Sequence, residues 1–140
     1  MALKMSQQEL TRFLTKVFPQ VSDDFTIEDV ADDALSVRLH VGAHNLRPGG
    51  TVSGPSMFAL ADVAIYLAIL SRIGPEALAV TTNCSIDFMR KPAAGRDLIG
   101  EARLLKLGRT LAVGDVLIRN EGGGDPVARA GLTYSIPPKK

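Results

Sequence analysis

A single carboxylate, that of Asp62, stands inside a long apolar stretch of the chain. The stretch runs from Met57 to Leu70, and Ala61 and Val63 flank the acid directly. A charged group buried in such a setting costs several kcal/mol unless it is paired, hydrogen-bonded or used in a reaction. Asp62 could therefore serve as a nucleophile or general base, or it could be a structural acid that caps a strand or pairs with an arginine.

The loop before this stretch has residues that favour the binding of an anion. Gly50 and Gly54 let the backbone approach a ligand closely, and Pro55 suits the first turn of a helix, where unpaired amides carry partial positive charge. An oxyanion that develops during a reaction would be stabilised at such a place. Pro55 and Asp62 are seven residues, or two helical turns, apart, so we expect the loop and the carboxylate to flank one groove, about 10 Å apart along the axis.

Two helices are predicted in the first half of the chain. The helix that carries Asp62 is predicted over residues 55–73, with a proline at its start and Gly74-Pro75 at its end. A capping-box pattern, Ser6 to Glu9, and apolar residues at helical spacing predict a short helix over about 6–18. The short helix is amphipathic, whereas the long one is apolar on nearly all faces.

The remaining segments alternate between apolar and polar residues, as strands do. A hairpin is predicted between residues 25 and 41, with its turn near Asp32-Asp33. After the long helix, a strand with one buried face is predicted over 82–88, and three further strands over about 97–106, 109–119 and 126–136. The last three or four strands form a meander, and residues 137–140 are expected to be a frayed tail.

This order of elements indicates an α+β domain. Strands that outnumber the helices and segregate around one hydrophobic helix suggest an antiparallel sheet that curls around that helix. A helix that is apolar on nearly all faces needs more cover than one small sheet provides. We therefore expect a second subunit to supply the missing cover, in a homo-oligomer.

Composition excludes several classes of protein. We expect residues 1–140 to form a single domain, because the length is that of one domain and 46% of the residues are hydrophobic. A formal net charge of +1 gives no general attraction to nucleic acid, and an apolar run of about 14 residues is shorter than the roughly 20 needed to cross a membrane. The lone Cys84 cannot form an internal disulfide and reads as a core residue, and the N-terminus shows no signal-peptide pattern. A cytoplasmic location is expected.

The motif Gly-Thr-Val-Ser-Gly-Pro-x₅-Ala-Asp, at residues 50–62, resembles a known family. It is followed by Thr-Asn-Cys-Ser-Ile-Asp-Phe-Met-Arg-Lys-Pro at 82–92 and by Gly-Arg-Thr-Leu-Ala-Val-Gly-Asp at 108–115. In this order and spacing the motifs resemble the hotdog-fold acyl-CoA thioesterases of the phenylacetate-pathway type, over about residues 33–134. The resemblance implies a hotdog fold, in which an antiparallel sheet wraps around one long helix.

The resemblance also implies catalytic roles. Asp62 stands at the position of the family's nucleophile or general base, and Gly54 at that of the glycine whose amide polarises the thioester carbonyl. Sites in the family are built by two subunits, so Asp62 would act beside Gly54 of the partner subunit in a homodimer or homotetramer. A hydroxyl on the strand after the helix commonly assists, and Thr82 is expected in this role because it is in phase with Cys84.

Further residues would bind the substrate. Arg90, Lys91 and Arg109 stand where such proteins often meet the phosphates of coenzyme A. Arg47 has the spacing of the family's loop asparagine, and Asn45 lies two residues further from the motif. Gly50 and Pro55 complete the binding loop, and Met57, Phe58 and Tyr66 are candidates for the wall of the acyl pocket. Coenzyme A is expected only as part of the substrate, with no metal or other cofactor.

Ser53 replaces the family's histidine, and Pro55 replaces its second glycine. Serine can donate a hydrogen bond but does not titrate near neutrality. The leading prediction is hydrolysis of a small or medium acyl-CoA or aryl-CoA thioester. One alternative is a non-catalytic hotdog protein that binds acyl-CoA or acts as a scaffold. A weaker alternative is a hotdog dehydratase, which usually presents a histidine where Ser53 stands.

Overall fold

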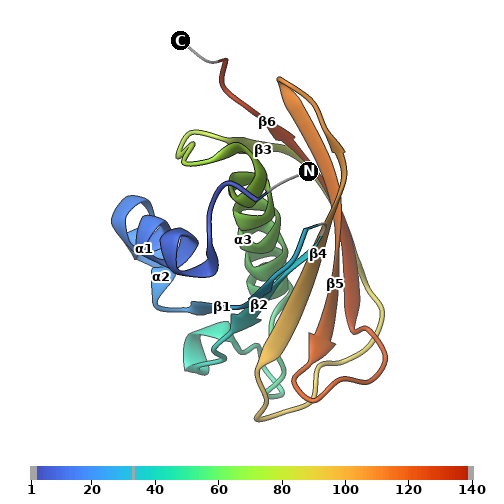
Figure 1. The fold of residues 1–140 in the computed structure, drawn as a ribbon. Helices are drawn as coiled ribbons and strands as arrows, with labels where there is room; N and C mark the ends of the chain where they lie inside the picture. Colours follow the sequence, from blue (N-terminus) through green and yellow to red (C-terminus); the bar gives the residue numbers. More distant parts are fainter. Residues whose placement is uncertain (1–2, 33, 139–140) are drawn as a thin grey trace.

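The computed structural model describes residues 3–32 and 34–138. One long helix runs along the concave side of a curved six-stranded sheet (Figure 1). In chain order the elements are α1 (Gln7–Val17), α2 (Pro19–Ser22), β1 (Phe25–Val30), β2 (Ala34–Leu39), η1 (Ala43–Asn45), α3 (Gly54–Ile73), β3 (Val80–Phe88), β4 (Leu98–Leu107), β5 (Leu111–Asn120) and β6 (Ala128–Ser135). The predicted α+β architecture, with a sheet around one helix, is confirmed.

The strands are ordered β1-β2-β4-β5-β6-β3, and every neighbouring pair is antiparallel. The predicted N-terminal hairpin is β1–β2, and β4, β5 and β6 form the predicted meander. β3 follows α3 in sequence but adds to the far side of β6, so it is an edge strand. Of the predicted turn and tail, residue 33 and residues 139–140 lie outside the described residues.

Local sequence sets the limits of α3. Gly49 and Gly50 adopt positive φ values of 100° and 83° in the loop before the helix, a backbone conformation that suits glycine. Ser53 is the N-cap, and its hydroxyl accepts a hydrogen bond from the Ser56 amide at 3.3 Å. The helix begins at Gly54, one residue before the predicted start, and Gly74, with φ of 93°, ends it.

α3 packs closely against the sheet at two glycines. A Cβ atom on Gly114 of β5 would lie 2.6 Å from Cδ1 of Ile65 and 2.8 Å from the carbonyl oxygen of Arg103. A Cβ on Gly100 of β4 would lie 3.1 Å from Cγ of Leu60. Since real Cβ contacts are longer than these, the two glycines set how near the helix lies to the sheet.

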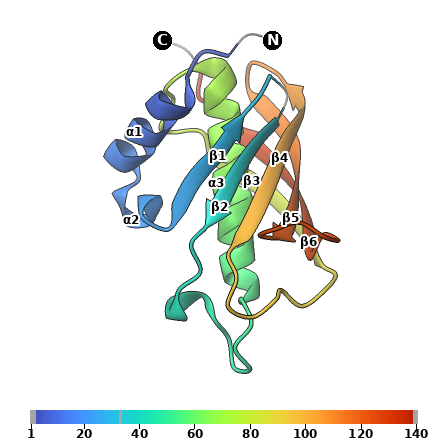
Figure 2. The ribbon, with the colours of Figure 1, turned by 60° about the horizontal axis from the view of Figure 1, so that its bottom comes forward.

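The chain itself covers the other side of α3. Figures 1 and 2 show α1 and α2 on the side of α3 that faces away from β4–β6, and Leu10 and Leu14 of α1 are buried there. Every residue of α3 from Leu60 to Arg72, except Asp62, is buried. The expectation that a second subunit must cover this helix is therefore wrong, because the amphipathic N-terminal helix supplies the cover.

The same burial explains the apolar composition of α3. Its length and hydropathy meet the requirements for a membrane span, but 72% of its most apolar window is buried inside the domain. A core helix of a globular domain has the same properties. The sheet and the N-terminal helices, not lipid, surround α3.

The two edges of the sheet differ. At the β1 edge, the side-chain amide of Gln7 in α1 donates to the carbonyl of Ile27 at 2.7 Å. At the β3 edge, no segment of the described part of the chain pairs with the outer side of the strand. No residue of β3 is fully buried, and Val80 and Phe88 are 56% and 52% exposed. The predicted buried face of this strand is thus only partly formed within one chain: Cys84 and Ile86 are half-buried and pack against the core.

Candidate active site

Asp62 projects from α3 toward the hydroxyl groups of two strands. The Tyr134 hydroxyl of β6 donates to Oδ1 of Asp62 at 2.8 Å, and the Thr81 hydroxyl of β3 donates to the same oxygen. Asp62 is half-buried, whereas Ala61 and Val63 on either side of it are fully buried. The carboxylate is thus held by neutral donors at the edge of the core, and no cation among the described residues pairs with it.

A bulge in β3 decides which threonine reaches this carboxylate. Thr81 is the register partner of Tyr134, and Asn83 is the partner of Thr133. Thr82 is therefore an extra residue between two successive pairs. Such an insertion reverses the inward and outward alternation of the residues that precede it in the strand.

Thr81, rather than Thr82, consequently faces α3. Thr82 is exposed, and its hydroxyl donates to the carbonyl oxygen of Thr133 at 3.3 Å. The prediction that Thr82 lies in phase with Cys84 is wrong, because strict alternation does not anticipate the bulge. The hydroxyl that the structure places beside Asp62 is that of Thr81.

Tyr134 is a second hydroxyl that the sequence prediction missed. Its side chain lies on the inner face of β6, and the residue is 2% exposed. Burial and the nearby charge of Asp62 raise the pKa of its hydroxyl far above the ordinary value. The phenol therefore stays protonated around neutral pH and acts as a hydrogen-bond donor.

A pocket of about 330 Å³ opens beside the carboxylate. Most of its wall is apolar, and the lining includes two residues from the junction of α1 and α2. The lining residues are Val17, Phe18, Asp62, Val63, Tyr66, Ala77, Ala79, Val80, Thr81 and Tyr134. Of the three predicted acyl-wall residues, Tyr66 lies here. A largely apolar chamber with one carboxylate, and with two hydroxyls that donate to it, suits an apolar group joined to a reactive carbonyl.

A second groove, of about 620 Å³, lies at the N-terminus of α3. It brings together residues of the glycine-rich loop and of the segment after β3. The lining residues are Arg47, Pro48, Gly49, Thr51, Val52, Gly54, Met57, Phe88, Met89, Arg90, Lys91 and Pro92. Four of the predicted site residues, Arg47, Gly54, Arg90 and Lys91, meet here. Three cations and the positive end of a helix make the groove suitable for an anionic ligand.

The Gly54 amide is available as a donor in this groove. As the first residue of α3 it has no partner within the helix, and the N-cap hydroxyl of Ser53 accepts from Ser56 instead. Pro55 has no amide hydrogen, so it cannot supply a second donor. Gly54 lies against the outer edge of the Phe88 ring, whose Cζ would be 3.1 Å from an added Cβ.

Two predicted polar residues of the loop maintain the loop itself. Asn45 is 6% exposed; its side-chain oxygen accepts from the Gly42 amide at 2.9 Å, and its amide donates to the Ser56 hydroxyl at 3.1 Å. The Ser53 hydroxyl also donates to the Ser56 hydroxyl at 3.1 Å. Asn45 and Ser53 therefore fix the entry to α3. Gly50 and Pro55 are exposed beside the groove and do not line it.

Arg109 lies far from both of these pockets. It lines a separate cavity of about 760 Å³ at the C-terminal end of α3, together with Lys4, Arg72 and residues of the β4–β5 turn. The prediction that Arg109 joins Arg90 and Lys91 is thus not fulfilled within one chain, because its strand turn points to the opposite end of the helix.

Asp62 and Gly54 also lie apart within one chain. The two residues are eight positions apart, or about 12 Å along the axis, and they line different pockets. Each pocket is covered by a different end of β3, through Thr81 in one case and Phe88 in the other. The expectation that carboxylate and loop flank one groove of the same chain is therefore wrong.

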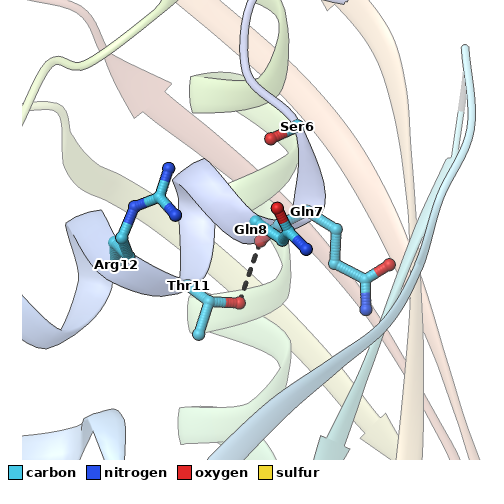
Figure 3. Close-up of a pocket in the computed structure, with 5 residues that line it drawn as sticks. All are labelled: Ser6, Gln7, Gln8, Thr11 and Arg12. Atoms are coloured by element: carbon cyan, nitrogen blue, oxygen red, sulfur yellow. Dashed lines mark hydrogen bonds between the residues drawn. The ribbon is translucent and has the colours of Figure 1, made fainter.

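A further hollow lies beside the first turns of α1 (Figure 3). Its lining residues are Ser6, Gln7, Gln8, Thr11 and Arg12, and the Thr11 hydroxyl donates to the Gln7 carbonyl at 2.9 Å within the helix. These residues come from one exposed helix and its cap, and they include no group that could act as a base. We assign no catalytic role to this hollow.

Cys84 is not an alternative nucleophile. It lies half-buried on β3, and burial together with the charge of Asp62 raises the pKa of its thiol. A thiol with a raised pKa carries little thiolate at neutral pH, and thiolate is the reactive form. Asp62 is therefore the group near these pockets that is best suited to attack.

Comparison with known proteins shows the family of this chain. A model of the thioesterase superfamily matches residues 49–127, which span the glycine-rich loop, α3 and β3 to β5. The human protein named acyl-coenzyme A thioesterase 13 is 25% identical over 138 residues, which cover 96% of this chain and 97% of the human protein.

Solved structures are similar over nearly the whole chain. The crystal structure of a candidate thioesterase from Silicibacter sp. TM1040 is 59% identical, with a TM-score of 0.92, and the match covers 99% of this chain and 96% of that one. The phenylacetic acid degradation protein PaaI from Thermus thermophilus, solved as a point mutant, is 29% identical, with a TM-score of 0.72, over 85% of this chain and 99% of that one. On this evidence the chain belongs to the thioesterase superfamily and is a thioester hydrolase with the hotdog fold.

Proposed function

We propose that the protein hydrolyses thioesters of coenzyme A with a small or medium acyl or aryl group, and that Asp62 acts on the carbonyl. The observation that carries the proposal is the Asp62 carboxylate, held by Thr81 and Tyr134 at the wall of an apolar pocket. A structural acid would be expected to pair with a cation in the core, whereas this one faces a chamber that suits an acyl group.

The chemistry needs only water, this carboxylate and a backbone amide. As a general base, Asp62 takes a proton from water, and the water oxygen attacks the thioester carbonyl. As a nucleophile, Asp62 attacks the carbonyl itself, and water then hydrolyses the resulting anhydride. Both routes break the carbon–sulfur bond, release coenzyme A as the thiol and leave the free acid, so coenzyme A enters only as part of the substrate.

The oxyanion donor comes from a second subunit. The open edge of β3 has the Asp62 pocket at its Thr81 end and the Gly54 groove at its Phe88 end. If two β3 strands pair in antiparallel fashion across a two-fold axis, opposite ends of the strand become neighbours. Asp62 of one subunit then faces Gly54 of the partner subunit, in a homodimer or in the dimers of a homotetramer.

The groove beside Gly54 would hold the coenzyme. Arg47, Arg90 and Lys91 line it, and cations of this kind bind phosphate groups well. With the phosphates at these side chains, the thioester end can enter the adjacent acyl pocket. The nucleotide is thus bound by one subunit and the acyl group by the other.

The size of the acyl pocket limits the substrate. A volume of about 330 Å³ has room for roughly ten non-hydrogen atoms at about 30 Å³ each. We expect free-thiol release from short, medium and aryl esters of coenzyme A to be much faster than from an ester with a sixteen-carbon chain. The measurement is a panel of esters under identical conditions, with the pantetheine thioester of the best acyl group as a control for nucleotide recognition.

Three outcomes of this panel would each contradict a part of the proposal. Exclusive turnover of the long-chain ester would refute the size limit, and absence of thiol release from every ester by the folded protein would refute the hydrolysis. Equal KM values for the coenzyme A ester and its pantetheine analogue would remove Arg47, Arg90 and Lys91 from substrate binding.

Neighbouring threonines of β3 offer a matched test of the geometry. Thr81→Val should lower kcat on the order of tenfold, because a hydrogen bond to a charged group is lost. Thr82→Val removes an exposed hydroxyl that bonds a backbone carbonyl, and it should change kcat less than twofold. Steady-state kinetics of both variants give the answer, and a larger effect at Thr82 would place the wrong threonine at the carboxylate.

A further inference from the structure

Tyr134 contacts the reactive group but lies beyond residues 49–127, which the family model matches. We propose that Tyr134 is a positioning residue that holds Oδ1 of Asp62 and thereby directs Oδ2 to the substrate. This role rests on the proposed function, in which Asp62 acts on a thioester. It adds a specific residue of β6 to a site otherwise built from α3, β3 and the loop before α3.

Both hydroxyl donors reach the same carboxylate oxygen. The Tyr134 hydroxyl lies 2.8 Å from Oδ1 of Asp62, and the Thr81 hydroxyl donates to Oδ1 as well. Among the described residues, no hydrogen bond reaches Oδ2. A carboxylate otherwise rotates broadly about its last torsion. Two donors on one oxygen fix that torsion and leave the lone pairs of the other oxygen available.

The phenol itself is held from several sides. Its hydroxyl also lies 3.1 Å from the backbone carbonyl of Asp62, and its ring centroid is 6.3 Å from that of Tyr66 at an interplanar angle of 35°. The Tyr66 hydroxyl in turn donates to the carbonyl of Ala77 at 3.1 Å. β6 lies between β5 and β3 inside the sheet. Tyr134 is therefore a rigid donor, as a positioning residue must be.

Tyr134 is not suited to move protons itself. Its proton is engaged with the carboxylate, and burial and the charge of Asp62 raise the pKa of the phenol. The other titratable groups near the carboxylate, Tyr66 of α3 and Cys84 of β3, also have raised pKa values because of burial. All three therefore stay neutral around pH 7 and act at most as hydrogen-bond donors.

The test is Tyr134→Phe, which removes the hydroxyl and keeps the ring contact with Tyr66. We expect kcat to fall on the order of tenfold, with KM changed less than twofold, because the lost bond orients the base and does not touch the acyl group.

Thr133→Val is the matched control on the same strand. Thr133 is half-buried beside Tyr134, and its replacement also removes one hydroxyl from β6, but away from Asp62. Its kinetics should match those of the wild type. A general loosening of β6 would affect both variants, whereas loss of positioning affects Tyr134→Phe alone.

A double-mutant cycle with Asp62→Asn, Tyr134→Phe and the double variant, measured by thermal unfolding, tests the same contact without catalysis. A coupling between the two sites is expected, and its absence would overturn the proposal. Unaltered kcat in Tyr134→Phe, with an active wild type, would overturn this role alone. A wild type inactive on every ester would overturn the proposed function and this role together.

Discussion

Asp62→Asn is expected to lower thiol release about a hundredfold or more, because the variant keeps the shape of the side chain but can neither attack a carbonyl nor accept a proton from water. The side-chain oxygen of asparagine can still accept from Thr81 and Tyr134, so the fold should persist. The measurement is kcat/KM on the best ester of the panel, with circular dichroism and size-exclusion chromatography of both proteins.

Asp29→Asn provides the matched control for this substitution. Asp29 is exposed on β1, so its replacement removes the same charge far from both pockets. It should leave the rate unchanged. If Asp62→Asn were as active as Asp29→Asn, Asp62 would have no part in the mechanism. The retained fold would then serve binding rather than turnover, which is the non-catalytic alternative.

Activity is expected to return when two inactive variants are combined in one dimer. In the proposed shared site, Asp62 comes from one subunit and Gly54 from the other. Gly54→Pro removes the amide hydrogen that polarises the carbonyl, and it should be nearly inactive. A mixed dimer of one Gly54→Pro subunit and one Asp62→Asn subunit has one site that carries both substitutions and one site that carries neither. Random reassortment therefore restores about one quarter of the wild-type activity.

The experiment mixes the two variants, each with a different affinity tag, and measures thiol release before and after double purification of the mixed dimers. Gly54→Ala is the matched control, because it adds a Cβ against the outer end of the exposed Phe88 ring but keeps the amide. Its activity should exceed that of Gly54→Pro many times over. Verified mixed dimers without any regained activity would show that each site lies within one chain.

The elements of the fold could be predicted from local sequence because their signals are local. Ser6 and Glu9 form the predicted capping box at the start of α1, with hydrogen bonds in both directions. α3 was predicted to within one residue, since a proline marks its start and Gly74 its end. Asp62 was recognisable as a candidate site residue because a lone acid in an apolar run has a high desolvation cost.

The partners of Asp62 depend on tertiary structure and could not be predicted in the same way. The bulge that turns Thr81 inward has no sequence signature, since Thr82 fits the alternation as well as its neighbour does. Tyr134 did carry a usable signal. A tyrosine on the buried face of a strand usually finds a partner for its hydroxyl, and that partner here is the one acid nearby.

Long-range arrangement accounts for the remaining differences. The predicted distance between Pro55 and Asp62 along the helix is correct. The two ends of this segment nevertheless line different pockets, because different residues of β3 pack beside each end. The position of Arg109 in a motif predicts a contact with the phosphates of coenzyme A. The β4–β5 turn instead places Arg109 in another cavity. The packing of α1 on α3 likewise depends on a contact between distant segments, which periodicity alone does not show.

The open edge of β3 has a consequence for the chain between its synthesis and its assembly. Unpaired amides and carbonyls at a strand edge are a template for other strands, and Val80 and Phe88 stand exposed along this one. At the opposite edge, Gln7 already occupies the carbonyl of Ile27. A newly made subunit therefore risks aggregation along one strand. In the proposed dimer, the same nine residues, Val80–Phe88, would both close this edge and complete the catalytic centre.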